Sequence, residues 1–177
     1  MFEALPHATG ADGKQLLERK LNQHFRQSNF KQTVVQGRQK DGRRDQEVMF
    51  SSLGNCEDLQ TLVDILYDLE IPITGIYSAP QICRHYLAPV LKRENVLIMT
   101  EIDNGILERV AVRQSFFHEG KLRLTRVGMI DVVDEEQVHH DVEESLESSR
   151  RYLLREKLIG PKDKLEVVFI SSTHYLE

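Results

Sequence analysis

The chain has 177 residues, a formal net charge of −5 and 40% hydrophobic residues. This length suits one domain or two small packed lobes, and the apolar fraction is large enough for a real core. A negative chain lacks the broad positive field that accompanies nucleic-acid binding, so we expect no nucleic-acid partner. No run of about 18 apolar residues and no signal peptide is found, which predicts that the fragment itself is soluble.

The two ends of the sequence differ from its middle. Residues 1–11 contain Pro, Gly and Ala without a periodic apolar pattern, which predicts a disordered N-terminal segment. The final Leu-Glu pair resembles the residues commonly left between an expressed fragment and a tag. We therefore interpret residues 176–177 as a cloning scar and the chain as a piece cut from a longer polypeptide.

The folded region begins with a predicted helix and a hairpin. After Asp12, apolar residues recur at helical spacing at Leu16, Leu17, Leu21 and Phe25. The next stretch reads "FKQTVVQGRQ", then a polar "KDGRRD" turn, then "QEVMFSSL". Two apolar strands around a polar turn predict a β-hairpin with a charged tip.

A second helix should follow, with Asn55 as its cap and a stripe directed at the core: Leu59, Leu62, Val63, Leu66 and Leu69. The run "IPITGIYS" is almost continuously apolar, which predicts a short buried strand. Pro80 then begins a further helix, which Pro89 interrupts or bends.

From residue 95 the pattern changes to strands. "NVLIMTEI" predicts a buried strand, which leads through "DNG" into "ILERVAVRQSFF" and through "HEG" into "KLRLTRVGMI". Glycine in both turns suits tight hairpins, so we expect three antiparallel strands in series. A long helix from about Glu135 to Leu158 and a last strand, "KLEVVFIS", complete a β-β-β-α-β order.

This order resembles the opening of the ribonuclease H-like unit on which actin-like ATPases are built. The preceding hairpin, helix, strand and helix are similar to the body of the same unit, and "GIYSAP" looks like the link between two halves. The resemblance covers residues 12–172 and implies an α/β fold with a mixed sheet flanked by helices. It implies an actin-like domain over residues 12–175, with lobes of about 12–93 and 94–175.

Three stretches carry a closer resemblance: "RKLNQHFRQSNFKQTVVQGRQKDGRRDQEVMFSSL", "LEIPITGIYSAP" and "VRQSFFHEGKLRLTRVG". They resemble the degenerate actin-like cytoplasmic domains of type IV pilus biogenesis and type II secretion platform proteins of Gram-negative bacteria. Such domains typically lack a working ATPase site, precede one membrane-spanning helix and bind other components of the machinery.

The resemblance implies a non-catalytic scaffold without a cofactor, located at the cytoplasmic face of the bacterial inner membrane. Its membrane tether would lie outside this sequence. Its partners would be other pilus or secretion assembly proteins, and a homodimer is left open.

The alternative function is that of a nucleotide-binding actin-like ATPase or sugar-kinase relative. Such a site needs glycine-containing hairpins whose backbone N–H groups surround the phosphates, and Asp103 with Gly105 is the candidate loop. The next four residues, from Ile106 to Arg109, are bulky or charged where a small hydroxyl residue is usual. We therefore interpret the loop as vestigial or as a plain hairpin turn, and we expect no catalytic residues.

Histidine and carboxylate residues also recur on the long predicted helix. His139 with Glu143, and His140 with Glu144, lie one helical turn apart and could each supply two metal ligands. A metal site needs at least a third ligand, which the sequence does not indicate. A solvated acidic helix face explains this pattern better, so we expect no metal.

Two groups of arginines are the candidate partner-binding residues. Arg38, Arg43 and Arg44 belong to the charged hairpin, where they could clamp a phosphate, an anionic lipid or an acidic partner, or only protect a sheet edge. The second group lies on adjacent predicted strands and could dock an acidic peptide: Arg109, Arg113, Arg123 and Arg126. We interpret the neighbouring Phe116 and Phe117 as core residues rather than as a binding hot spot.

Overall fold

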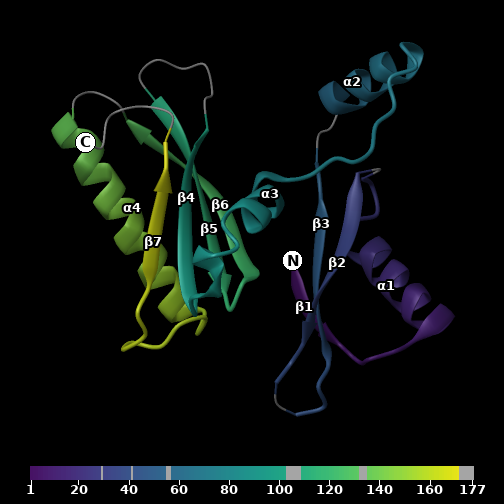
Figure 1. Cartoon of the computed structure of the whole chain (residues 1–177), viewed down its shortest axis with the longest axis horizontal. Coiled ribbons are helices and arrows are strands. Elements are labelled where there is room, and N and C mark those ends of the chain that lie inside the picture. Colours follow the sequence, from purple (N-terminus) through teal and green to yellow (C-terminus); the bar gives the residue numbers. More distant parts are fainter. Residues whose placement is uncertain (29, 41, 55–56, 103–108, 132–134, 172–177) are drawn as a thin grey trace. The chain divides into compact units, whose positions relative to one another are not determined.

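Figure 1 shows the chain as a computed structural model, which describes residues 1–28, 30–40, 42–54, 57–102, 109–131 and 135–171. The chain divides into two compact units, Met1–Ile76 and Tyr77–Glu177, each with its own β-sheet. The boundary lies at Ile76 and not near residue 93, where the sequence analysis divided the lobes. The expected mixed α/β class, with sheets flanked by helices, is confirmed.

The first unit is built on an antiparallel three-stranded sheet with the strand order β1-β3-β2. Its elements are β1 (Phe2–Leu5), α1 (Gly10–His24), β2 (Lys31–Arg38), β3 (Gln46–Ser52) and α2 (Glu57–Asp68). The predicted apolar residues of α1 pack onto the buried side chains Leu5, Val48 and Phe50. The first helix and the charged hairpin are therefore confirmed.

The start of the chain is ordered, against the expectation of a disordered segment over residues 1–11. β1 pairs along β3, from Phe2 opposite Met49 to Leu5 opposite Gln46. The amino group of Met1 donates a hydrogen bond of 2.8 Å to the carbonyl oxygen of Phe50. The physical reason is that β3 needs a partner on its second edge, and a four-residue strand is too short to show a period in sequence.

Two further expectations for the first unit are wrong. α2 forms as predicted, but none of its residues is buried, so its apolar stripe does not face a core. Residues 71–78 form no strand, although "IPITGIYS" is apolar. A strand needs a neighbouring edge to satisfy its backbone groups, and no described strand pairs with this segment.

The second unit has a four-stranded mixed sheet with the order β6-β5-β4-β7. Its elements are α3 (Ala79–Tyr86), the 3₁₀ helix η1 (Val90–Lys92), β4 (Asn95–Ile102), β5 (Arg109–His118), β6 (Lys121–Asp131), α4 (Glu135–Arg155) and β7 (Glu166–Ile170). Strands β4, β5 and β6 are antiparallel neighbours, whereas β7 pairs parallel to β4. The expected β-β-β-α-β order is thus confirmed.

The core of the second unit lies between this sheet and α4 (Figure 1). Leu97, Met99, Val112 and Phe116 of the sheet pack with Leu153 of α4. Both Phe116 and Phe117 are fully buried, which confirms them as core residues.

α4 ends at Arg155, three residues before the predicted Leu158. Lys157 adopts a positive φ of 55°, and the amide of Leu158 donates to the carbonyl of Leu153 at 2.9 Å. This left-handed cap closes the helix and turns the chain towards β7.

Candidate functional site

The predicted phosphate loop lies outside the described residues. β4 ends at Ile102 and β5 begins at Arg109, so neither Asp103 nor Gly105 is described. The two flanking strands are antiparallel neighbours, with Ile102 opposite Ala111. The interpretation of the loop as vestigial stays a prediction.

The basic hairpin forms as expected, and its three candidate arginines are exposed. Arg38 is the last residue of β2, next to the hairpin turn, and its Nη2 atom is 2.6 Å from Nε2 of His7. Arg43 and Arg44 lie in the tip, and Arg44 adopts a positive φ of 56°. The tip therefore presents two guanidinium groups beyond the body of the sheet.

The arginines of the second unit do not share one face of the sheet. Arg113 lies opposite Val127, whereas Arg126 lies opposite the next residue, Gln114, and so on the other face. Arg123 lies at a β-bulge, where the register between β5 and β6 shifts. The side chain of Arg109 lies outside the described part of the chain.

Arg126 belongs to a polar network between the sheet and α4. Its Nε donates to Oε1 of Gln114 at 2.6 Å, and its Nη2 donates to Oγ of Ser149 at 2.8 Å. Gln114 also donates to Oγ of Ser145. Because Gln114 and Ser149 are only 1% exposed, their polar atoms depend on these bonds. Arg126 thus holds α4 on the sheet. Its expected role in partner binding stays a prediction.

Arg113 has different surroundings. It lies on the sheet face opposite to α4, between Thr100 of β4 and Val127 of β6. Its Nε is buried, and no hydrogen-bond partner for this atom occurs in the described part of the chain. On the same face, Val127 and Met129 are 51% and 49% exposed. We call this region, made of Thr100, Ile102, Arg113, Val127 and Met129, the open sheet face.

A second unsatisfied surface runs along α2 and the segment after it. We call it the α2 surface, and its large apolar side chains are all between 43% and 80% exposed: Leu62, Ile65, Tyr67, Leu69, Ile71, Ile73 and Ile76. Within residues 54–83 the sequence has five acidic residues and no Lys, Arg or His. The α2 surface is therefore apolar with an acidic rim.

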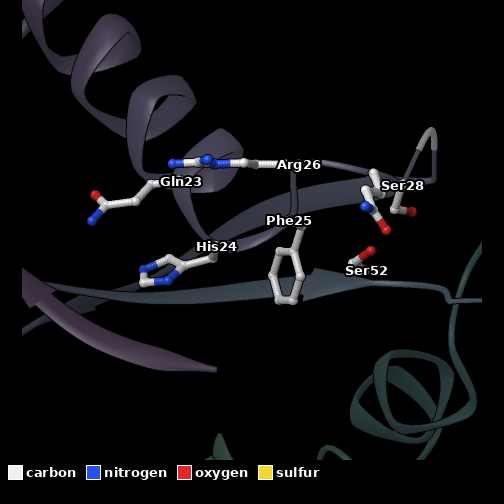
Figure 2. Close-up of a pocket in the computed structure, with 7 residues that line it drawn as sticks. Gln23, His24, Phe25, Arg26, Ser28 and Ser52 are labelled. Atoms are coloured by element: carbon white, nitrogen blue, oxygen red, sulfur yellow. The ribbon is translucent and has the colours of Figure 1, made fainter.

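A depression of about 360 Å³ lies at the end of α1 and is lined by Gln23, His24, Phe25, Arg26, Gln27, Ser28 and Ser52. Figure 2 shows the side chains that line it. His24 is fixed there by Glu3, whose Oε2 lies 3.0 Å from its Nε2. The hydrogen bonds from Lys20 and then His24 lower the pKa of Glu3 below its ordinary value. These contacts tie α1 to β1.

Neither a metal centre nor a membrane helix emerges from the residues that the structure describes. Among them, no group of three or more His, Cys, Asp or Glu side chains could hold a metal ion. His139 and His140 are exposed on α4. Likewise, no helix within the described ranges is both long and apolar enough to cross a bilayer.

No protein-family model matches the sequence, and no curated protein matches it. Among solved structures, the chain is similar to a Bacteroides thetaiotaomicron VPI-5482 protein described as having an actin-like ATPase fold and unknown function. The two share 11% identity with a TM-score of 0.42, and the match covers 98% of this chain but 57% of the other. The chain therefore spans little more than half the length of that protein.

Sequence reasoning missed both the α2 surface and the network around Arg126. The α2 residues were recognised as an amphipathic stripe, but a stripe indicates only that a helix needs an apolar neighbour. The available signal was charge, since the α2 region carries acids without any base. The polar network had no signal, because Gln114 and Ser149 are 35 positions apart and meet only through the fold.

Proposed function

We propose that this chain is a non-catalytic scaffold domain that docks partner proteins in a bacterial pilus or secretion assembly at the inner membrane. The observation that carries the docking role is the exposed α2 surface. Half-exposed Leu62 and Ile65 and the 80% exposed Tyr67 lie within two turns of one helix. Fully burying side chains of this kind stabilises by about 1.5–3 kcal/mol each.

The charge of the α2 surface favours a protein partner over a lipid surface. The rim residues Asp64 and Asp68 are exposed, and the inner leaflet of a membrane is itself anionic. An acidic rim would be repelled there, whereas it complements Arg or Lys around an apolar patch on a protein. The exposed Arg43 and Arg44 of the hairpin tip offer a separate contact for an acidic partner.

The setting in a pilus or secretion assembly is supported by the sequence resemblance alone. The stretches "LEIPITGIYSAP" and "VRQSFFHEGKLRLTRVG" that carry it include the end of the α2 surface and the hairpin of β5 and β6. The nucleotide-binding alternative depends on Asp103 and Gly105, which lie outside the described residues. The docking role therefore rests on a described surface, and the nucleotide site does not.

Site-specific photo-cross-linking in a bacterium that carries the natural gene tests the proposal. A photoreactive phenylalanine analogue at Tyr67, which is 80% exposed, should cross-link to an inner-membrane pilus or secretion protein. The matched control is the same analogue at Tyr86 of α3, which is 82% exposed but lies outside the α2 surface. Equal adducts at both positions, or adducts only with unrelated proteins, would contradict the proposal.

A further inference from the structure

We infer that this chain forms a dimer in which β6 of one copy pairs antiparallel with β6 of a second copy. The sheets of the two copies then join edge to edge across a twofold axis. This contact lies apart from the proposed docking role, since it uses an edge strand and not the α2 surface. All of its residues belong to the second unit of each copy.

β6 is an edge strand with an open side. It stands at one end of the strand order β6-β5-β4-β7 and is the longest of the described strands (Figure 1). Within the described part of the chain, β5 is the only strand that pairs with it. An edge strand presents a row of backbone N–H and C=O groups, which forms a template for a further strand.

The exposed side chains of this sheet are confined to its edge. On the face away from α4, Ile98 of β4 and Ala111 of β5 are buried. On the same face of β6, Val127 and Met129 are 51% and 49% exposed. These two side chains lack the cross-strand neighbours that cover the inner strands on their outer side. A strand added to β6 would supply those neighbours.

The second half of β6 lacks the features that usually protect an edge. The stretch from Val127 to Ile130 contains no charged residue and no proline. Gly128 lies within this stretch, and it is not part of a bulge, because the register shift with β5 lies at Phe116 and Phe117. A Cβ atom added at Gly128 would meet no atom within 4 Å. A glycine inside a strand often marks the close approach of another backbone.

The charges along β6 favour a second copy as the added strand. Lys121 and Arg123 lie at the start of the strand, and its last residue is the acidic Asp131. An antiparallel partner of the same sequence places the basic start of each strand beside the acidic end of the other. The contact is also closed, because a twofold pairing uses β6 of both copies and leaves no β6 edge for a third.

The residues near the middle of β6 set the register. A twofold axis at Arg126 would put two arginines opposite each other, which disfavours that register. An axis at Val127 puts Val127 opposite itself and Arg126 opposite Gly128, where no side chain competes for space. In the same register Thr125 lies opposite Met129, so the exposed side chains of the two copies cover one another.

Cysteine cross-linking tests the contact together with its register. In a chain with Cys56 and Cys83 replaced by Ser, Val127→Cys should form an intermolecular disulfide on mild oxidation, because directly opposite Cβ atoms lie about 4.5–5.5 Å apart. Thr125→Cys alone and Met129→Cys alone should not, since neither residue faces its own copy. An equimolar mixture of these two variants should form the mixed disulfide. Non-reducing electrophoresis measures all four results.

Molar mass by sedimentation equilibrium over a micromolar range tests the contact without a cross-link. The unchanged protein should form a dimer. Val127→Lys puts two cations opposite each other and should weaken self-association by at least about tenfold. The matched control is Val35→Lys on β2, an edge strand of the first unit, where Val35 is 45% exposed. This control should leave the dimer unchanged, and circular dichroism checks the folding of both variants.

A monomer at every concentration would overturn the inference, and so would a disulfide that forms as readily from Thr125→Cys alone as from Val127→Cys. An equal loss of self-association in the two lysine variants would also contradict it. These outcomes are distinct from a failure of the scaffold proposal, which is measured by cross-linking at Tyr67. A monomer that still gives the adduct at Tyr67 keeps the docking role and excludes only the β6 contact.

Discussion

Helices α2 and α4 have the same design in sequence and opposite surroundings in the structure. Both carry an amphipathic stripe, and both end in a left-handed cap formed by a residue other than glycine, Glu70 after α2 and Lys157 after α4. The amides of Ile71 and Leu158 close these caps with bonds of 2.9 Å to the last turn of each helix. Yet Leu153 of α4 is fully buried, and no residue of α2 is.

The difference begins after the caps. The chain after α4 enters β7, which pairs along β4, with Val168 opposite Ile98 and Phe169 opposite Met99. This pairing fixes the helix over the sheet, because the connection is short and both of its ends are anchored. The chain after α2 enters residues 71–78, which form no strand. An amphipathic helix is therefore held by the strand that follows it as much as by its own stripe.

The largest expected effect compares one leucine from each helix. Leu153→Ala should lower the free energy of unfolding by about 2–5 kcal/mol, because the side chain is 0% exposed and its removal leaves a cavity. Leu62→Ala makes the same chemical change at a position that is 51% exposed, and should cost less than about 1 kcal/mol. Urea unfolding of both variants measures the difference. Equal losses would mean that α2 is packed as α4 is.

The next effect compares two arginines on opposite faces of the same sheet. Arg126→Ala removes donors to Gln114 and Ser149 and leaves buried polar atoms underbonded, so we expect a loss of about 1–3 kcal/mol. Arg113→Ala removes a side chain whose Nε has no partner, and stability should change by less than about 0.5 kcal/mol. Urea unfolding of both variants provides the comparison. A greater loss for Arg113→Ala would show that the open sheet face is already occupied.

A smaller effect concerns α1, which is attached to its sheet partly by charge. The pKa of Glu3 is lowered by the Lys20 and His24 side chains, so the carboxylate stabilises the fold at pH values above its ordinary value of 4.5. This contribution is lost as the pH falls through the lowered pKa, since protonation then removes the ion pair. Glu3→Gln should cost below about 1 kcal/mol at pH 7 and less at pH 3. Urea unfolding of the unchanged protein and of the variant at both pH values measures this cost. An equal cost at pH 3 would contradict the ion-pair role.

Local patterns predicted the second unit well. Glycine in the turns of the sequence predicted the strands from residue 95 onward. In the described turn between β5 and β6, Glu119 and Gly120 adopt positive φ values of 49° and 71°. The stripe of α4 predicted its buried side because β7, its anchor, lies only about ten residues away in sequence. Short-range signals suffice when the partner of each element is its neighbour in the chain.

Where partners are distant, sequence patterns failed. β1 lies more than 40 residues from the strand that it pairs with, and its four residues have no recognisable period. The arginines of the candidate site were found by type, but their roles depend on register. Arg113 lies opposite Val127, and Arg126 lies opposite Gln114, the next residue along β5. Because neighbouring positions of a strand point to opposite faces, this difference of one position puts the two arginines on different faces of the sheet. Residue type alone marked both arginines as candidate site residues. Only the pairing of β5 with β6 shows that Arg126 lies on the face of the sheet towards α4 and Arg113 on the other face.

The smallest expected effect is that of Mg-ATP, which addresses the loop between β4 and β5. Because residues 106–109 are bulky or charged where a phosphate loop needs small ones, we expect no change in the thermal unfolding midpoint at millimolar nucleotide. A working site at about 100 times its dissociation constant would stabilise by roughly 2.7 kcal/mol, which raises the midpoint measurably. The control is MgCl₂ alone at the same ionic strength. An increase specific to ATP would favour the nucleotide-binding alternative, which depends on the stretch between β4 and β5 and not on the α2 surface.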